Sequence, residues 1–325
     1  MIKQVPFADT GATVSNFCLG TMMFGDRCDE AEASRIMACA LEHGVNFVDT
    51  AAVYTGGQTE EILGRILKGR RNRVFLATKV NVPDGTDYPA QIGPSLDASL
   101  ARLQTDHVDL YLIHWARKNM NPEAMLRALS TVVQAGKCRF VGCSNFPAWL
   151  IAHFNGLATR MGVPRLVNNQ LPYNLIERGL EVEILPQAVA ERIAITCYRP
   201  LMAGVLSGKY DPDQPLPSDS RSASDTRIAG WLTDHATGVR KLVALAKDRG
   251  VNPAHVAIAW VRNQLGVTAP IIGVSRLAQF EDSLSAFSLT LTGTEQKDLA
   301  DAFGTAVKEV SQYYGPLRRS FELLA

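Results

Sequence analysis

The feature that most constrains the fold of this sequence is a regular alternation of short apolar runs with amphipathic stretches. The apolar runs lie near residues 16–20, 45–48, 73–78, 108–113, 138–143, 166–170, 193–197 and 268–272. Helical patterns follow them, as in residues 29–44, where apolar side chains recur at three- and four-residue spacing up to Gly44. Strands apolar enough to be buried on both faces, and separated by helices, are typical of a parallel sheet.

Eight such repeats within 325 residues predict a (β/α)8 TIM barrel, formed as a single domain over residues 1–325. No Gly-x-Gly-x-x-Gly motif follows the first strand, which argues against an open Rossmann sheet. Residues 2–15 are predicted to form a β-hairpin ahead of the barrel. Residues 199–236, rich in Pro, Ser, Asp and Gly, are predicted to form a long loop after strand seven, either a lid or an insertion.

The composition favours a soluble cytoplasmic protein that acts on a small molecule. Lys and Arg number 33 and Asp and Glu 32, without a basic block, so neither nucleic acid nor an anionic membrane is an expected partner. No apolar run is long enough for a signal peptide or a membrane span. The six scattered cysteines favour buried thiols in a reducing compartment over disulfides or a metal site. The oligomeric state stays open, and a homo-oligomer is possible.

Three neighbouring strands of the predicted barrel end on ionisable residues. These are Asp49, Lys79 and His114, and Tyr54 lies on the loop after the first of them. Polar residues at the C-terminal ends of barrel strands point into the catalytic mouth. We therefore predict that the four side chains form one site, at the same level of the barrel.

The residue types indicate the chemistry of this site. A free phenol has a pKa of about 10 and donates its proton poorly at neutral pH. A neighbouring ammonium should lower the pKa of Tyr54, and Asp49 should hold Lys79 charged and oriented. His114 can orient a bound carbonyl or share the proton. Reduction of a carbonyl also needs a nucleophile, and no side chain here is an obvious one. We therefore expect a reduced nicotinamide to supply a hydride.

The sequence resembles the aldo-keto reductases, which are NAD(P)H-dependent oxidoreductases built on a (β/α)8 barrel. The resemblance extends from "LGTMMFG" to "LTLTGTEQ" and includes "GVNFVDTAAVY", "LATK", "DLYLIHW", "GKCRFVGCSNF", "NNQLPYNLIER", "YRPLMAGVLSGKY" and "APIIGVSRLAQFEDSLSAF". It implies a catalytic tetrad of Asp49, Tyr54, Lys79 and His114, the residues already selected by their chemistry. Trp115 is a further candidate for contact with substrate.

The resemblance also implies how the nicotinamide end of the cofactor is held. Ser144, Asn145 and Gln170 match residues that bind the carboxamide, and Tyr198 matches the aromatic that stacks on the ring. Alternatively, Ser144 or Asn145 caps the following helix. Thr21 and Met22 match a loop that lines the cofactor.

Further matches concern the phosphates and the adenosine. The family's Y-S-P-L appears as Y-R-P-L, so Arg199 either grips the pyrophosphate or points to solvent. The implied binding residues of this region are Pro200, Leu201, Gly204, Lys209 and Arg221. The residues implied around the adenosine 2′-phosphate are Gly273, Ser275, Arg276 and Gln279. Ser275 together with Arg276 favours NADP(H) over NAD(H) as the cofactor. Alternatively, Arg276 is a solvated helix residue without a role in binding. Asp282 and Ser283 replace a frequent Glu-Asn pair and imply looser adenine binding.

The leading hypothesis is therefore an NADPH-dependent, reversible reductase of aldehydes or ketones, with Tyr54 as the proton donor. One alternative is a regulatory cofactor-binding subunit, as in the potassium-channel β subunits that belong to the same family. A second is an aldolase that uses Lys79 as a Schiff-base nucleophile. The sequence does not specify the substrate, the preferred direction or the role of the C-terminal tail.

Overall fold

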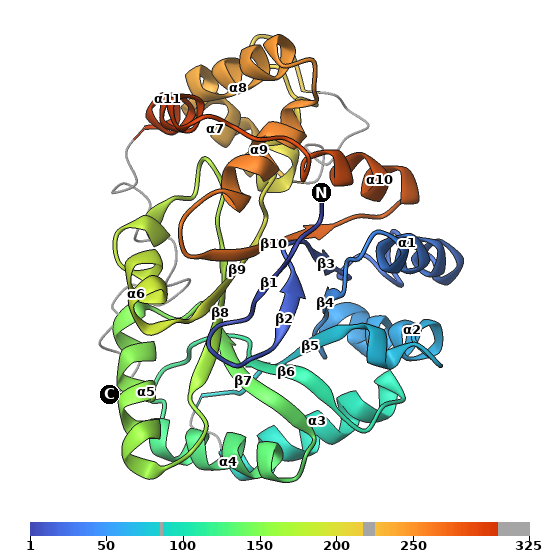
Figure 1. The fold of residues 1–325 in the computed structure, drawn as a ribbon, viewed down its shortest axis with the longest axis vertical. Helices are drawn as coiled ribbons and strands as arrows, with labels where there is room; N and C mark the ends of the chain where they lie inside the picture. The colour runs from blue at the N-terminus through green and yellow to red at the C-terminus, as the bar shows by residue number, and fades with distance from the viewer. Residues whose placement is uncertain (85–86, 217–224, 305–325) are drawn as a thin grey trace.

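A closed parallel barrel confirms the predicted (β/α)8 architecture. The computed structural model describes residues 1–84, 87–216 and 225–304. Its eight barrel strands follow the order β10-β3-β4-β5-β6-β7-β8-β9, and Figure 1 shows the helices outside them. The strands are β3 (Cys18–Gly20), β4 (Phe47–Asp49), β5 (Phe75–Val80), β6 (Val108–Ile113), β7 (Cys138–Ser144), β8 (Leu166–Pro172), β9 (Ala194–Tyr198) and β10 (Val267–Gly273).

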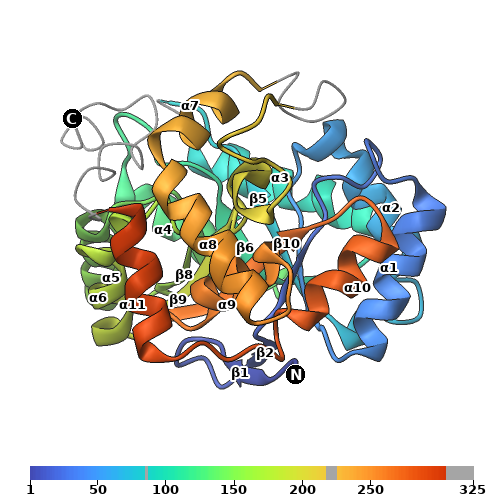
Figure 2. The ribbon, with the colours of Figure 1, turned by 90° about the horizontal axis from the view of Figure 1, so that it is seen from above.

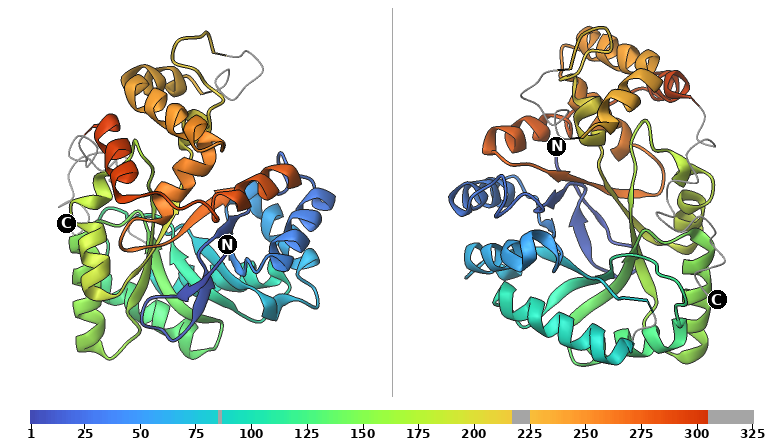
Figure 3. Two further views of the ribbon diagram at one scale, coloured as in Figure 1. Left: turned by 45° about the horizontal axis from the view of Figure 1, so that its top comes forward. Right: turned by 180° about the vertical axis from the view of Figure 1, so that it is seen from behind.

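The helices of the structure include the one predicted over residues 29–44. They are α1 (Glu30–Glu42), α2 (Gln58–Ile66), α3 (Tyr88–Leu103), α4 (Pro122–Gln134), α5 (Ala148–Met161), α6 (Ile184–Glu191), α7 (Arg227–Asp234), α8 (Ala236–Asp248), α9 (Pro253–Arg262), α10 (Leu277–Ser285) and α11 (Gly293–Phe303). Figure 3 shows that α8 (orange) and α11 (red), which contact each other, lie together beside the barrel.

Two apolar clusters form the core. The larger one lies between the strands and the surrounding helices. The smaller one fills the barrel interior, with Phe47, Phe75 and Leu110 among its members. Because side chains alternate between the two faces of a strand, the interior cluster identifies which positions of each strand point inward.

The predicted N-terminal hairpin is confirmed. Strands β1 (Gln4–Pro6) and β2 (Thr13–Ser15) pair antiparallel. Phe7, in the turn between them, is fully buried, and its ring centroid lies 4.8 Å from that of Phe75. Figure 2 shows the hairpin at one end of the barrel and α7 at the other. The hairpin therefore covers the end opposite to α7.

The prediction of a continuous loop over residues 199–236 is wrong in part. The segment contains a 3₁₀ helix, η4 (Met202–Ser207), and the helix α7. Ile228 and Leu232 of α7 are buried, four residues apart, and this helical spacing follows directly after a stretch of Ser and Asp. The polar stretch made the whole segment resemble a loop. Residues 217–224 and the C-terminal tail lie outside the described residues.

Candidate active site

Strand geometry directs Asp49, Lys79 and His114 into the barrel interior. Phe47, Phe75 and Leu110 point inward, and the three ionisable residues follow them at even offsets, two within the same strands and His114 directly after β6. Even offsets keep a side chain on the same face of a strand. The backbone therefore directs all three side chains toward the barrel interior.

The strand register places the three ionisable residues in regular steps from one strand to the next. Asp49 pairs with Ala77, and Lys79 pairs with Leu112, so each ionisable residue lies two positions beyond the partner of the previous one. The stagger reflects the tilt of barrel strands. The long side chain of Lys79 spans the offset and reaches Asp49.

Lys79 is the centre of the site. Its side chain is fully buried, and its Nζ donates to Asp49 Oδ2 at 2.7 Å, to the Thr50 carbonyl at 2.8 Å and to Tyr54 Oη at 3.1 Å. These bonds match the three donors of an ammonium group. The cation is thus fully hydrogen-bonded, and the Tyr54 hydroxyl lies against it.

A tight turn places the Tyr54 ring. Tyr54 begins the 3₁₀ segment η1 (Tyr54–Gly57), in which φ is 48° at Thr55, 64° at Gly56 and 100° at Gly57. Glycine adopts positive φ without the steric cost that a Cβ imposes. The sequence "TGG" therefore reverses the chain directly after Tyr54 and lets α2 begin at Gln58.

Burial changes the expected acidity of Tyr54. Burial raises the pKa of Tyr54 more than the Lys79 ammonium lowers it, so the net pKa lies above the ordinary value of 10. The predicted effect of Lys79 on the pKa of Tyr54 is therefore present, but burial outweighs it. Burial alone would lower the pKa of Lys79, but Asp49 and Tyr54 together raise it. Tyr54 is thus protonated and Lys79 charged at neutral pH.

His114 is neutral at physiological pH. Burial, followed by the charges of Lys79 and Arg117, lowers the pKa of His114 from 6.5 to about 3. Its ring centroid lies 6.2 Å from that of Tyr54 and 6.1 Å from that of Trp115, which stacks on it. Of the two roles that the sequence left open, a neutral imidazole favours orienting a carbonyl over sharing its proton.

A β-bulge directs Gln170 toward the tetrad. Val141 pairs with Leu166 but Cys143 pairs with Asn169, so β8 carries one extra residue between these pairs. A bulge reverses the facing of the residues that follow it. Gln170 then donates from Nε2 to Asp49 Oδ1 at 2.8 Å, across the barrel interior.

The other residues predicted to bind the carboxamide lie beside Gln170. Ser144 Oγ donates to the Gln170 carbonyl at 2.8 Å, and Asn145 Nδ2 donates to Ser144 Oγ at 2.9 Å. The Tyr198 hydroxyl donates to Asn145 Oδ1 at 2.8 Å. The alternative that Ser144 or Asn145 caps α5 is wrong, because the residue before this helix is Pro147 and no side chain caps it.

This donor set fits a nicotinamide cofactor. Amide and hydroxyl groups of Ser144, Asn145 and Gln170 meet next to Asp49, and they offer both donors and acceptors to a primary carboxamide. Thr21 is buried and donates from Oγ1 to the Asp49 carbonyl at 2.8 Å, whereas Met22 is exposed. The cluster thus adjoins the tetrad directly.

Arg199 contacts protein groups. Its Nη1 donates to Glu177 Oε1 at 3.3 Å, and its Cζ lies 5.2 Å from the ring centroid of Trp231 on α7. The prediction that the Arg199 side chain points to solvent is therefore wrong, because the guanidinium group contacts Glu177 and Trp231. The turn before η4 contains Pro200 and Leu201, and η4 itself contains Gly204. Lys209 follows η4 and is exposed. Arg221 lies outside the described residues.

The residues predicted near the adenosine lie at the start of α10. Ser275 donates from N and Oγ to Gln279 Oε1 at 2.9 and 3.2 Å, and the side chain of Arg276 is exposed. Gly273, the last residue of β10, is exposed before them. Asp282 accepts from Asn252 Nδ2 at 2.9 Å, and Ser283 donates to the Gln279 carbonyl at 2.7 Å within the helix.

Sequence reasoning missed an acidic residue at this helix end. Glu32 Oε1, from α1, accepts a bond of 2.6 Å from the Leu277 backbone N–H, which is the first of α10. A carboxylate at a helix N-terminus is favourable, and it occupies a place that would also favour a phosphate. Residues 32 and 277 are too far apart in sequence for any local pattern to connect them.

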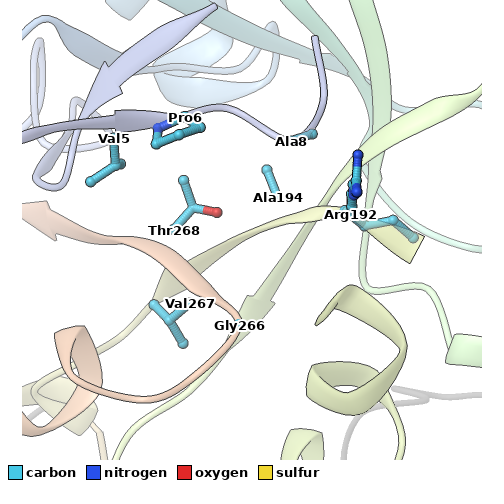
Figure 4. Close-up of a pocket in the computed structure, with 9 residues that line it drawn as sticks. Val5, Pro6, Ala8, Arg192, Ala194, Gly266, Val267 and Thr268 are labelled. Atoms are coloured by element: carbon cyan, nitrogen blue, oxygen red, sulfur yellow. The ribbon is translucent and has the colours of Figure 1, made fainter. Parts of the chain in front are cut away.

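The opposite end of the barrel carries a different hollow. It lies between the hairpin and the starts of β9 and β10, has a volume of about 260 Å³, and is lined by Pro6, Ala8, Arg192 and Thr268 among others (Figure 4). Arg192 is the only charged residue that lines it. The tetrad and this hollow therefore belong to separate ends of the molecule.

The structure also bears on the predictions about cysteines, metal sites and membrane spans. All six cysteines are unpaired and five are buried, in agreement with the prediction of core thiols. Among residues 1–84, 87–216 and 225–304, no group of three or more His, Cys, Asp or Glu side chains is placed to hold a metal ion. No helix in the same part of the chain has the length and apolarity needed to cross a membrane.

Comparison with known proteins identifies related chains. A sequence model described as the Aldo/keto reductase family matches residues 16–302. The uncharacterized oxidoreductase YrpG of Bacillus subtilis is 36% identical over 322 residues, which cover 94% of this chain and 97% of that protein. The aldo-keto reductase YhdN of the same species is 32% identical, covering 92% of each chain. A probable voltage-gated potassium channel subunit beta of Arabidopsis thaliana is 33% identical, covering 85% and 88%.

Proposed function

The chain belongs to the aldo/keto reductase family of oxidoreductases, which act on carbonyl groups, and from this premise we propose that it reduces an aldehyde or ketone to an alcohol with NADPH. The observation that carries the proposal is the bonding of Lys79 Nζ to both Asp49 and Tyr54. This arrangement holds one protonated phenol against a fixed cation at the C-terminal end of the barrel. The reaction is reversible, and the cofactor ratio sets its direction.

Each tetrad residue has a distinct role in the proposal. Tyr54 donates its proton to the carbonyl oxygen as negative charge develops there. The Lys79 ammonium stabilises the resulting phenolate, and Asp49 keeps Lys79 charged and in place. His114, neutral and stacked on Trp115, donates a hydrogen bond that orients the carbonyl oxygen. Trp115 contributes an apolar wall for the substrate.

The cofactor would be held by groups next to the tetrad. Ser144, Asn145 and Gln170 would bind the carboxamide, and Tyr198 would contact the ring. When bound, a reduced nicotinamide supplies the hydride for the carbonyl carbon. We propose that NADP(H) binds more tightly than NAD(H), because the exposed Arg276 at the start of α10 can pair with the 2′-phosphate. The Glu32 carboxylate at the same helix end repels that phosphate and should make the difference in affinity smaller.

A regulatory role is the second candidate. Relatives from Arabidopsis thaliana and Schizosaccharomyces pombe carry names of potassium-channel β subunits, with 33% and 30% identity. Such a protein would bind the cofactor and act mainly on a partner. The Schiff-base aldolase has less support, since the Lys79 amine is fully buried and donates three hydrogen bonds. The six unpaired thiols support a location in the cytoplasm.

The proposal is tested by fluorescence titration with NADPH and NADH, followed by a panel of aldehydes and ketones with absorbance at 340 nm. We expect tighter binding of NADPH and its oxidation by at least one carbonyl class. Binding without any turnover would favour the regulatory candidate. If neither nucleotide bound, the reductase assignment would be wrong.

Substitution of Tyr54 by Phe tests the proton donor. The variant should lose about 10²- to 10⁴-fold in kcat, because that is the usual contribution of a positioned general acid. Its affinity for NADPH should stay unchanged, since the ring remains and only the hydroxyl is removed. Unchanged turnover would remove Tyr54 from the mechanism.

A further inference from the structure

Within the part of the chain that the structure describes, the guanidinium group of Arg117 has no partner, although this residue is only three positions after His114. It lies in the connection between β6 and α4, and its backbone N–H donates to Met120 Sδ at 3.3 Å. Within the described residues, its side chain forms no hydrogen bond or ion pair, and its Nε is buried without a partner. A donor removed from water without a replacement partner costs free energy.

Comparison with the other arginines shows that this is unusual. Eight arginines of the described residues are half-buried, and six of them donate to a carboxylate or a backbone carbonyl. Those six are Arg71, Arg102, Arg165, Arg178, Arg199 and Arg262. Arg70 and Arg117 are the exceptions, and of these two only Arg117 has a buried side-chain nitrogen without a partner. The fold therefore pairs most of its half-buried arginines with acceptors. Among the unpaired ones of the described residues, Arg117 is the one with a buried donor.

The charge of Arg117 acts on the tetrad itself. It contributes, after burial and Lys79, to the lowered pKa of His114. Lys79 is neutralised by Asp49 at 2.7 Å, whereas Arg117 has no acidic partner among the described residues. Within the described residues, the positive charge of Arg117 near His114 is therefore not compensated by an acidic side chain.

We propose that Arg117 binds a carboxylate on the substrate, so that the enzyme prefers carbonyl compounds that carry a carboxylate over neutral ones. The planar guanidinium fork matches the two oxygens of a carboxylate and offers two parallel hydrogen bonds. This inference rests on the proposed reductase function and names the substrate class of the same site.

The test compares 4-carboxybenzaldehyde with methyl 4-formylbenzoate, which have the same ring and aldehyde but differ in charge. NADPH oxidation is measured for wild type, Arg117→Gln, Arg117→Lys and Arg127→Gln. Arg127 is an exposed arginine of α4, away from the tetrad, and serves as the matched control. Circular dichroism establishes that each variant is folded.

Arg117→Gln should raise KM for the acid by roughly 10- to 100-fold, which is the effect expected from loss of a charge-assisted hydrogen bond. KM for the ester should change less than about twofold. For both substrates, kcat of the variant should be similar to that of wild type. Arg117→Lys should recover part of the affinity for the acid, because it restores the charge without the fork. Arg127→Gln should behave as wild type.

Two results would overturn the inference while the reductase function stands. One is an unchanged ratio of the two KM values in Arg117→Gln. The other is an equal fall of kcat for both substrates, which would make Arg117 a positioning residue for His114. If wild type reduces neither aldehyde, calorimetric titration with 4-(hydroxymethyl)benzoate still decides, since binding must weaken in Arg117→Gln for the carboxylate site to stand.

Discussion

Lys79 is the residue on which the geometry of the site depends. It is a fully buried cation, and burial of an isolated ammonium is unfavourable by several kcal/mol. Asp49 compensates its charge, and Gln170 bonds the second oxygen of Asp49 at 2.8 Å. Both oxygens of the Asp49 carboxylate are therefore hydrogen-bonded. Rotation of this carboxylate would leave a buried polar group without a partner.

The neutral state of His114 predicts a pH dependence of stability. The pKa of this imidazole is about 3 in the folded protein and 6.5 as its ordinary value. Below pH 6.5 the unfolded chain binds a proton at this residue that the folded chain does not, so stability falls as the pH falls. Compared with His114→Gln, wild type should lose about 1.4 kcal/mol per pH unit between roughly pH 6 and 4.

Urea denaturation at several pH values measures this difference. Above pH 7 the two curves of unfolding free energy against pH should run parallel, because the imidazole is neutral in both states. Parallel curves down to pH 4 would show instead that His114 protonates normally in the folded protein. In the same range, activity should show no inflection near pH 6.5.

At the scale of elements, small backbone irregularities determine which side chains face the site. The bulge in β8 directs Gln170 inward, and the turn at Thr55–Gly57 fixes the ring of Tyr54. The neighbouring helices must then pack closely against these elements. Helix α2, which begins directly after the turn, packs closely against α3.

Gly64, inside α2, allows this close packing. A Cβ at this position would lie 2.5 Å from the Arg102 carbonyl oxygen and 2.8 Å from the Leu103 carbonyl carbon, both backbone atoms of α3. Gly64→Ala should therefore destabilise the protein by about 1–3 kcal/mol, although alanine is the better helix former. Thermal or urea unfolding measures the effect.

Gly156→Ala is the matched control for this prediction. Gly156 is exposed in α5, and a Cβ there would meet only the Arg160 side chain at 3.9 Å. This substitution should stabilise the protein by about 0.5–1 kcal/mol through helix propensity alone. Equal effects at both positions would contradict the close approach of α2 and α3.

At the scale of the whole molecule, the two ends of the barrel do different work. The hairpin covers the N-terminal end and contributes Phe7 and Val14 to the interior cluster. The tetrad lies at the C-terminal end, where α7 is also found. Stability and chemistry are thus separated along the barrel axis, as is general for this architecture.

Phe7→Ala tests the separation. Phe7 is fully buried, with its ring 5.8 Å from Phe47 and 4.8 Å from Phe75, so its removal should cost about 3–5 kcal/mol of unfolding free energy. KM and kcat should stay close to wild type at temperatures where the variant is folded. Thr13→Ala, at an exposed position of β2, should change stability by at most about 0.5 kcal/mol. A large change in KM for Phe7→Ala would contradict the separation.

The sequence by itself determined the barrel and identified the ionisable residues at the strand ends. Both depend on local information, namely the spacing of apolar residues and the types of residue that end each run. The hairpin around Phe7 was predictable for the same reason. Helix α7 was missed because polar residues preceded its two buried apolar positions, Ile228 and Leu232.

Only the tertiary structure decided the electrostatics of the site. The raised pKa of Tyr54 and the lowered pKa of His114 depend on burial, which no short pattern records. The bond from Gln170 to Asp49 and the bond from Leu277 to Glu32 join residues that are distant in the chain. Closure of the barrel brings these groups together and excludes water from them, and that exclusion sets their protonation states.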